Sequence, residues 1–285
     1  MMGKSEIRNS KLETNPKFEI RNFVLALALF LGLDAAFTQT RRLEQPPPLS
    51  AAEGAREAKA LVAEMLAEKP EQNSTNVGVL KIRDPEGNQR QIPLKITTLI
   101  TAKSWLQIYD TSTPPLHEWV KGEKGHRITP LSSGTILTII HTSEKTNQYF
   151  HSTSAESPPK LLSPAELMAP FAGSDFWIAD LGYEFLHWPK QIVIKNDMRH
   201  SRACKVLESI NPNPTSGGYT RVLCWITVEK PHAPVHADAY DTSGRFKQFD
   251  PKNLEKVNGV YQIESVEMRN SRTGSHTVLE FDTTP

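Results

Sequence analysis

Three side chains have the types and spacing that metal ions use. His232, His236 and Asp238 share parity, so on a regular strand they would face one side and could ligate a metal. Pro231 and Pro234 interrupt this stretch, and proline within a strand is typical of an edge or an irregular segment. No further ligand signal accompanies the three residues. We therefore interpret the histidines as solvated side chains at an irregular edge, and we predict neither a metal site nor a cofactor.

Residues for acid–base or nucleophilic catalysis are equally sparse. Asp175 and Asp180 could act as paired carboxylates, but Ser174-Asp175 before an apolar run is typical of a helix cap. The segment His117-Glu118-Trp119-Val120-Lys121 lacks the second histidine of a zinc-protease helix, and no Gly-x-Ser-x-Gly elbow occurs. A glycosidase would need two buried carboxylates beside an open cleft. We therefore predict no catalytic residues and rank an exported hydrolase last among the functional hypotheses.

Composition and charge exclude several protein classes. The 285 residues include 33 Lys and Arg against 32 Asp and Glu, so the chain lacks the net basic charge of a nucleic-acid-binding domain. Two cysteines are too few for a disulfide scaffold or a zinc ribbon. Because 38% of the residues are hydrophobic, the chain can bury a sizeable core, as one large domain or two small ones.

The N-terminal region has the layout of a secretory signal peptide. An apolar run from Phe23 to Leu33 follows Lys17 and Arg21 and precedes Asp34-Ala35-Ala36. The run is shorter than the ~20 residues of a membrane span, although an uncleaved anchor is the alternative. We predict a signal peptide over residues 1–36, a Pro-rich linker over 37–49, a domain over 50–285, and a periplasmic location.

One amphipathic helix precedes the rest of this domain. Ser50 can cap it with Glu53 three residues later, and Ala51–Lys69 carries apolar residues at three- and four-residue spacing. Pro70 ends the pattern. A second, aromatic-rich helical segment is expected at Ser163–Leu186.

From Val77 onward the apolar residues instead alternate with a period of two, separated by short polar turns. The predicted strands are Val77–Asp84, Arg90–Ile100, Trp105–Asp110, His117–Glu123, Thr135–His141, Asn147–His151, Ser201–Ile210, Tyr219–Val228, Val235–Asp241, Arg245–Asp250, Val260–Arg269 and Ser275–Phe281. Connections this short join antiparallel neighbours, which excludes a doubly wound nucleotide-binding sheet in the first half. We predict a mainly β (α+β) fold, in which a single large curved antiparallel sheet closes toward a barrel.

The two cysteines lie on neighbouring predicted strands. If Ser201–Ile210 and Tyr219–Val228 form a hairpin around the loop Asn211–Gly218, Cys204 and Cys224 lie almost opposite each other. Opposed Cα atoms about 4.5–5.5 Å apart are within reach of a disulfide, and an oxidising compartment favours one. We predict a cross-strand disulfide, with two inert buried thiols as the alternative.

Some strands are apolar on both faces. Tyr219–Val228 has Val222, Cys224 and Ile226 on one face and Leu223 and Trp225 on the other. A solvated outer face would alternate more cleanly, so something covers the second face. The cover is the Ala51–Lys69 helix, the Ser163–Leu186 insertion or an apolar ligand, and ordinary helix-on-sheet packing explains most of these positions.

The chain resembles a known family along most of its length. The segments that carry the resemblance are Gly173-Ser174-Asp175-Phe176, Ala179-Asp180-Leu181, Cys204-Lys205-Val206-Leu207-Glu208, Arg221-Val222-Leu223-Cys224-Trp225-Ile226, Val266-Glu267-Met268-Arg269-Asn270 and His276-Thr277-Val278-Leu279-Glu280-Phe281. In this order they are similar to the outer-membrane lipoprotein-sorting (LolA-like) proteins, from about Thr75 onward. The chain departs from the family in its longer N-terminus.

The resemblance implies a half-open antiparallel barrel with a helical lid over an apolar cavity. We expect lid or cavity roles for Phe171, Phe176, Trp177, Leu181 and Phe185, and cavity walls from Trp105, Ile108, Ile139, Trp225 and Ile226. For each of these residues a purely structural core role is the alternative.

The implied function is that of a monomeric periplasmic carrier without enzymatic activity. It would hold lipoprotein acyl chains or other lipids during sorting to the outer membrane. An inner-membrane transporter or an outer-membrane receptor would be its further partner, and nucleic acid would not. A periplasmic sensor or binding module that uses the same pocket is the second hypothesis, ranked lower because no second domain or transmembrane relay is visible.

Overall fold

The computed structural model describes residues 49–112, 134–142, 146–257 and 260–282, with the backbone alone over 253–257 and 260–262. The predicted signal peptide, the linker up to residue 48 and the strand expected at His117–Glu123 lie outside these residues. Within the described part of the chain, no helix is both long enough and apolar enough to cross a membrane.

The N-terminal helix is confirmed as α1 (Ala51–Ala67). Its first turn is capped as the sequence predicts, because the Glu53 amide donates to Ser50 Oγ at 3.3 Å and the Ser50 amide donates to the Glu53 carboxylate at 3.2 Å. The buried side of α1 includes Gly54, Ala58 and Leu61 at helical spacing. A Cβ at Gly54 would lie 2.4 Å from the Val193 carbonyl oxygen, so glycine allows the helix to pack closely on the neighbouring strand.

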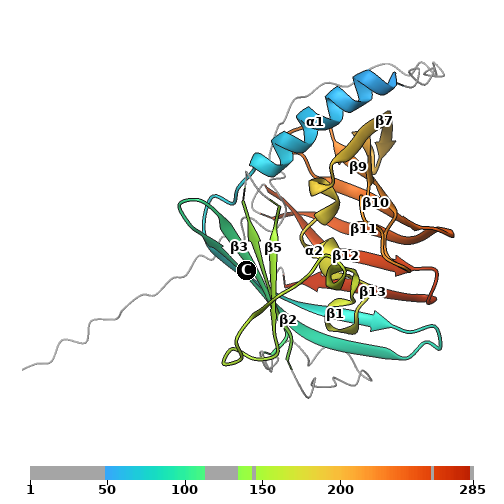
Figure 1. Ribbon diagram of the computed structural model, residues 1–285. Coiled ribbons are helices and arrows are strands. Elements are labelled where there is room, and N and C mark those ends of the chain that lie inside the picture. The colour runs from blue at the N-terminus through green and yellow to red at the C-terminus, as the bar shows by residue number, and fades with distance from the viewer. Residues whose placement is uncertain (1–48, 113–133, 143–145, 258–259, 283–285) are drawn as a thin grey trace, which may run out of the picture.

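In the described part of the chain, thirteen antiparallel strands form one sheet, which confirms the predicted fold class (Figure 1). The strands are β1 (Ser74–Arg83), β2 (Gln89–Ile100), β3 (Trp105–Asp110), β4 (Ile136–His141), β5 (Gln148–Ser152), β6 (Lys160–Leu161), β7 (Lys190–Arg199), β8 (Arg202–Ile210), β9 (Arg221–Thr227), β10 (Pro234–Asp241), β11 (Gly244–Val257), β12 (Val260–Asn270) and β13 (Ser275–Phe281). The sequence missed β6 and β7, and β11 is longer than predicted.

The strand order explains why one segment of the chain must cross the face of the sheet. Strands β1 to β6 form one meander and β7 to β13 another, and the two meanders meet where β1 pairs with β13. As a result β6 and β7 are the opposite edges of the sheet. The chain between them, residues 162–189, must span the sheet from edge to edge. We call it the crossing segment, and it contains the short helices η1 (Glu166–Met168), η2 (Phe171–Gly173), α2 (Ile178–Leu181) and η3 (Glu184–His187).

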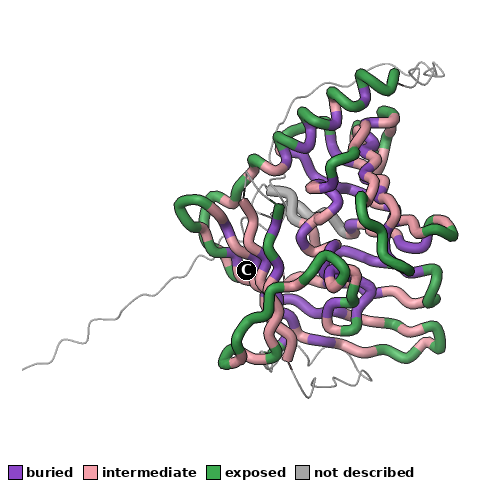
Figure 2. Tube along the Cα trace, viewed as in Figure 1, coloured by how far each residue is buried: buried purple, intermediate pink, exposed green. Residues whose placement is uncertain are grey.

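The core consists of two apolar clusters, both on the face of the sheet that α1 and the crossing segment cover (Figure 2). One cluster joins α1 and part of the crossing segment to β7–β11. The other joins the rest of the crossing segment to β1–β5, β12 and β13. We call this covered face the inner face and the opposite one the outer face. The helices therefore supply the cover that the two-sided apolar strands require.

Candidate functional site

The crossing segment is an irregular, aromatic-rich cover that lies against both core clusters. The Phe171 amide donates to the Phe176 carbonyl at 2.8 Å, and the Ile178 amide donates to the Ala169 carbonyl at 3.1 Å. Ala172 and Tyr183 adopt positive φ angles of 50° and 48°, a conformation that costs energy in residues with a side chain. The segment is thus held by a few specific contacts rather than by continuous secondary structure.

The five predicted lid residues all belong to this cover. Phe171 and Phe176 are buried in the cluster against β1–β5, and Leu181 packs at its margin. Trp177 and Phe185 are buried in the other cluster. The structure therefore places these five side chains between the crossing segment and the inner face.

The predicted wall residues divide between the two faces. Ile139 and Ile226 are fully buried on the inner face. Trp105 is also buried there and stacks on His141, with ring centroids 3.8 Å apart. Ile108 and Trp225 lie on the outer face, where Trp225 Nε1 donates to Asp197 at 3.0 Å, so their prediction as cavity walls is wrong. Both belong to strands that are apolar on two faces, and in such strands alternation does not identify the inner side.

A buried lysine connects the crossing segment to the sheet, and the sequence-based prediction missed it. Lys247 on β11 is 1% exposed and points to the inner face. Its ammonium nitrogen lies 3.1 Å from Asp180 Oδ2 and 2.8 Å from the Tyr219 hydroxyl oxygen. The Tyr219 hydroxyl in turn donates to Asp180 Oδ1 at 2.8 Å. We call Lys247, Asp180 and Tyr219 the buried latch, since Asp180 belongs to α2 and the other two to the sheet and its loops.

Aromatic rings complete the surroundings of this latch. The Lys247 ammonium lies 4.0 Å from the centroid of the Trp177 ring, and Trp177 stacks on Tyr219 at 4.6 Å between ring centroids. Burial lowers the pKa of Lys247 to about 8, because desolvation outweighs the attraction of Asp180. Lysine is still protonated at neutral pH with such a pKa. The latch is therefore a desolvated ion pair, in which removing one partner leaves the other charge buried.

Asp175 and Asp180 have separate structural tasks and do not form a catalytic pair. Asp175 accepts hydrogen bonds from Ser275 Oγ at 2.6 Å and from Thr277 Oγ1 at 2.9 Å, which anchors the crossing segment on β13. Asp180 accepts from the Trp177 amide at 2.7 Å and so caps α2. The sequence indicated Ser174-Asp175 as the cap, but the capping carboxylate comes from inside the helix.

On the side of β3 and β5, polar side chains hold the crossing segment. The Tyr109 hydroxyl donates to the Leu181 carbonyl at 3.2 Å, and Asn147 Nδ2 donates to the Gly182 carbonyl at 2.8 Å. The Tyr149 hydroxyl donates to Glu184 at 2.8 Å. Burial raises the pKa of Glu184, although this hydrogen bond opposes the effect.

Two cavities adjoin the crossing segment. One, of about 30 Å³, lies beside the latch among Tyr183, Phe185 and Cys224. The other, of about 310 Å³, opens to solvent at the far end of the segment between Arg90, His151 and Phe171. The first has room for about two water molecules, whereas small-ligand pockets begin at about 300 Å³. The inner face is therefore closed over the latch, since the crossing segment's own side chains fill the space.

The predicted disulfide is absent, because the hairpin register differs from the expected one. Cys204 lies opposite Thr227, and Cys224 lies opposite Leu207. Both thiols are free and buried. The alternation of the strand places Cys204 on the outer face and Cys224 on the inner face, where it joins the core. The loop before β9 extends to Thr220, whose carbonyl accepts from the Asn211 amide, and this longer loop shifts the register.

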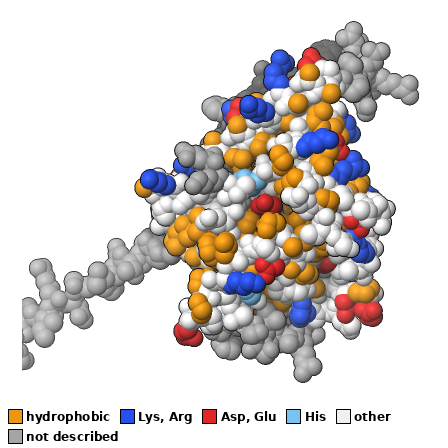
Figure 3. Space-filling model, viewed as in Figure 1, with side chains coloured by type: hydrophobic (Ala, Val, Ile, Leu, Met, Phe, Trp, Pro, Cys, Tyr) orange, Lys and Arg blue, Asp and Glu red, His pale blue; other side chains and the backbone are white. Residues whose placement is uncertain are grey.

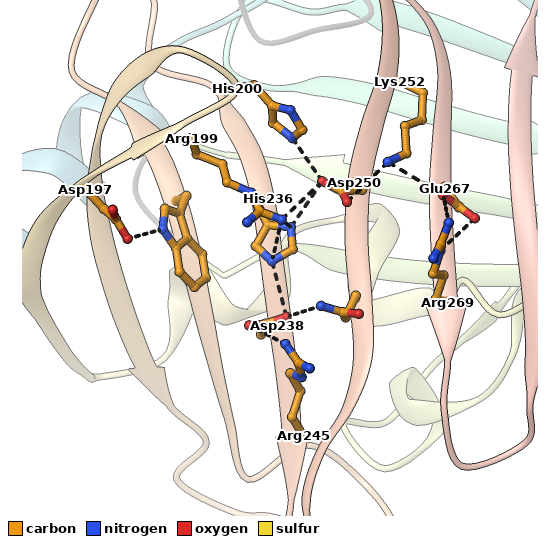
Figure 4. Close-up of polar contacts among 12 residues, drawn as sticks. Asp197, Arg199, His200, His236, Asp238, Arg245, Asp250, Lys252, Glu267 and Arg269 are labelled. Atoms are coloured by element: carbon orange, nitrogen blue, oxygen red, sulfur yellow. Dashed lines mark hydrogen bonds and ion pairs between the residues drawn. The ribbon is translucent and has the colours of Figure 1, made fainter.

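The histidines that the sequence singled out are buried and do not share a site. His232 Nε2 contacts Glu64 of α1 at 2.9 Å, while His236 lies on the outer face between Asp238 and Asp250, at 3.3 and 3.2 Å (Figure 4). An irregular register between Pro234 and His236 breaks their common parity. The prediction of solvated histidines is wrong. Among the described residues, no cluster of three or more His, Cys, Asp or Glu side chains is arranged to hold a metal.

The positively and negatively charged side chains around His236 form ion pairs with one another. Burial lowers the pKa of His236, but the hydrogen bonds to its two carboxylate partners outweigh burial, so the pKa is raised overall. The same contacts hold the pKa of Asp250 below its usual range against the effect of burial. Lys252 and Glu267 extend this network across the outer face (Figure 4).

Comparison with known proteins places the chain in a structural context. A family model with the description "-like: Uncharacterized protein" matches residues 132–284, more than half of the chain. No curated protein matches the sequence.

Several solved structures share the fold. A domain from Vibrio parahaemolyticus, assigned to outer membrane lipoprotein-sorting proteins, has a TM-score of 0.61 at 16% identity over 82% of this chain and 92% of its own. A DUF1329 family protein from Desulfovibrio piger has a TM-score of 0.58 at 17% identity over 81% and 92%. A LolA superfamily protein from Nitrosomonas europaea has a TM-score of 0.50 at 16% identity over 80% and 91%. The match over residues 132–284 places the chain in the family of that model, and the likeness to these solved structures shows that its fold is that of the LolA-like proteins.

Proposed function

We propose that this protein is an exported, non-enzymatic carrier that holds acyl chains between the crossing segment and the inner face of the sheet. The observation that carries the proposal is the combination of an inner face that is apolar over two large clusters with an irregular cover held by a few polar contacts. Both core clusters include side chains of the crossing segment, so displacing it would expose apolar surface on both halves of the sheet. In this role the crossing segment acts as the lid.

The volume of the closed cavity determines how binding would proceed. The space of about 30 Å³ beside the latch cannot take an acyl chain, so a chain that binds this part of the inner face must replace lid side chains. Each buried CH₂ contributes ~0.8 kcal/mol, and a chain of many such groups can offset the loss of the buried latch and of the lid's hydrogen bonds. The ligand would therefore stabilise an open state of the lid by its differential affinity for that state.

The cellular role that fits this mechanism is transport of lipid or lipoprotein toward the outer membrane. The predicted signal peptide over residues 1–36 supports a periplasmic location. Hydrophobic side chains reach the surface among charged ones in the view of Figure 3, which offers a first contact for an acyl chain. Release would require a partner that competes for the chain or favours the closed lid, such as a membrane receptor.

The test is native mass spectrometry of the full chain purified from the periplasm, followed by organic extraction of bound lipid. We expect co-purifying acyl lipid that is lost when Phe176 and Trp177 are both replaced by Glu. Met198→Glu is the matched control, because this side chain is 63% exposed. Circular dichroism spectra check that each variant is folded. A ligand-free mass for the unaltered protein, even after incubation with lipid vesicles, would refute the carrier function.

Hydrogen exchange tests the movement of the lid independently. Lipid loading should accelerate exchange of the Ile178 and Leu186 amides, whose acceptors lie within the crossing segment. Amides in the β12–β13 pair should stay protected. Equal protection of the lid in the loaded and empty protein would show that lipid, if bound, lies elsewhere.

A further inference from the structure

One end of the inner face is polar, in contrast to the apolar rows beside it. Ser74, Asn76, Thr98, Gln107 and His141 lie here, and we call them the polar patch. Ser74 pairs with Thr98 across β1 and β2, and Thr98 pairs with Gln107 across β2 and β3. Asn76 follows Ser74 by two residues, and His141 stacks on Trp105, two residues before Gln107. Alternation along each strand therefore directs all five side chains to the inner face.

The polar patch has an unusual excess of unused hydrogen-bonding groups. Six buried side-chain atoms in the described part of the chain have no hydrogen-bond partner, and four of them belong to this patch. They are Ser74 Oγ, Asn76 Nδ2, Thr98 Oγ1 and His141 Nε2. Thr98 is 1% exposed and Asn76 is 8% exposed, so water does not freely reach them. Buried polar groups are normally paired, and such a concentration of unpaired ones points to a ligand that pairs them.

The patch is also uncharged. Burial and the neighbouring His187 lower the pKa of His141 to about 3, so this imidazole is neutral at physiological pH. The five residues of the patch include no Lys or Arg, which a phosphate group would need as counter-charge. The donors Asn76 Nδ2 and Thr98 Oγ1 suit a carbonyl oxygen instead.

The lid meets the sheet directly beside this patch. Tyr109, Asn147 and Tyr149 hold the segment Leu181–Glu184 by hydrogen bonds. Tyr109 lies on β3, as Gln107 does, Tyr149 lies on β5 beside the strand of His141, and Asn147 directly precedes β5. When the lid opens, their polar atoms become available too. Next to them lie the apolar rows of Ile96, Leu137 and Ile139. The opened inner face would thus be apolar in the middle and polar at one end.

We infer that the polar patch binds the uncharged, carbonyl-bearing head of an acyl lipid, while the acyl chains lie along the apolar rows. This inference rests on the proposed carrier function and adds the orientation and the head-group class of its ligand. A neutral acyl ester or amide fits the patch. A phosphate head does not, and a bare hydrocarbon leaves the polar atoms unpaired.

The test compares three probes on the delipidated full chain: dioctanoylglycerol, its ether analogue dioctylglycerol without ester carbonyls, and dioctanoyl phosphatidate. We expect the ester to bind about fivefold more tightly than the ether for each hydrogen bond that the ether cannot accept. The phosphatidate should bind more weakly than the ether. In Thr98→Val the preference for ester over ether should shrink, because the hydroxyl that recognises the carbonyl is gone. The matched control is Thr97→Val, on the same strand but facing outward.

Thr98→Val also has an effect on stability that runs against its effect on binding. Replacing an unpaired buried hydroxyl by a methyl group should raise the midpoint of urea unfolding while binding of the ester weakens. A lower midpoint would mean that Thr98 has a structural partner, which overturns the inference. Equal affinities for ester, ether and phosphatidate, or an unchanged preference in Thr98→Val, would also overturn it and leave the carrier function standing. Failure of the unaltered protein to bind any of the three probes would remove both.

Discussion

The buried latch predicts an unusual dependence of stability on pH. Because the pKa of Lys247 is lowered to about 8 in the folded protein, the unfolded chain holds this proton up to a pH of about 10.5 and the folded chain does not. Between these values the unfolded state binds more protons, so this group makes stability rise with pH. The lowered pKa corresponds to about 3 kcal/mol in total, of which about 2 kcal/mol is gained by pH 9.5.

Lys247→Met removes this dependence and keeps the length of the side chain. The measurement is urea unfolding of both proteins at pH 7.5, 8.5 and 9.5, and the quantity of interest is the difference between their free energies of unfolding. Burial raises the pKa of tyrosines such as Tyr109 in both folded proteins alike, so most of their effect on the pH dependence cancels. We expect the difference to change by about 2 kcal/mol in favour of the unaltered protein as pH rises. Lys252→Met, on the outer face of the same strand, should show no such change. Parallel curves for Lys247→Met would mean that the lysine is not desolvated as described.

Three further outcomes follow from the packing. Gly54→Ala should cost about 1–3 kcal/mol despite the better helix propensity of alanine, since its Cβ would lie 2.4 Å from the Val193 carbonyl, and a higher melting temperature would contradict this. The ion pairs of protonated His236 stabilise the fold fully below pH 6.5, and this stabilisation is lost as pH rises through the raised pKa of the histidine. His236→Gln should therefore lower the free energy of unfolding more at pH 5.5 than at pH 8. An equal loss at both pH values would argue against the ion pairs. Thiol titration of the unfolded, unreduced protein should find both Cys204 and Cys224 free, and a requirement for reductant would restore the disulfide.

The overall fold follows from local signals that the sequence states clearly. Period-two alternation and short polar turns identify most of the strands, and Ser50 with Glu53 marks the start of α1 within one residue. The strand β7 was missed because Ile192, Val193 and Ile194 are followed by charged residues without clean alternation, and a register shift between Val193 and Lys195 interrupts its pairing.

The candidate site was only partly predictable. Aromatic residues identified the segment that covers the inner face, but Trp225 and Ile108 were assigned to the wrong face since both faces of their strands carry apolar residues. Lys247 was overlooked because a lysine in a strand normally marks a solvated face. Its parity with Phe249, which packs against the inner cluster, was the available signal. The hairpin register of the cysteines depended on the loop conformation, which composition does not determine.

The pairing of β1 with β13 has a consequence for how the molecule is assembled. Leu80 in the first strand lies opposite Leu279 in the last described one, so the central pair of the sheet joins segments that are far apart in the sequence. While the chain is synthesised, strands β1–β6 and strands β7–β12 can each begin to form their meander, but none of these described strands joins the two meanders until β13 is made. The last of the described strands to be made thus occupies the middle of the sheet, and the inner face becomes one surface only when this strand has paired on both sides.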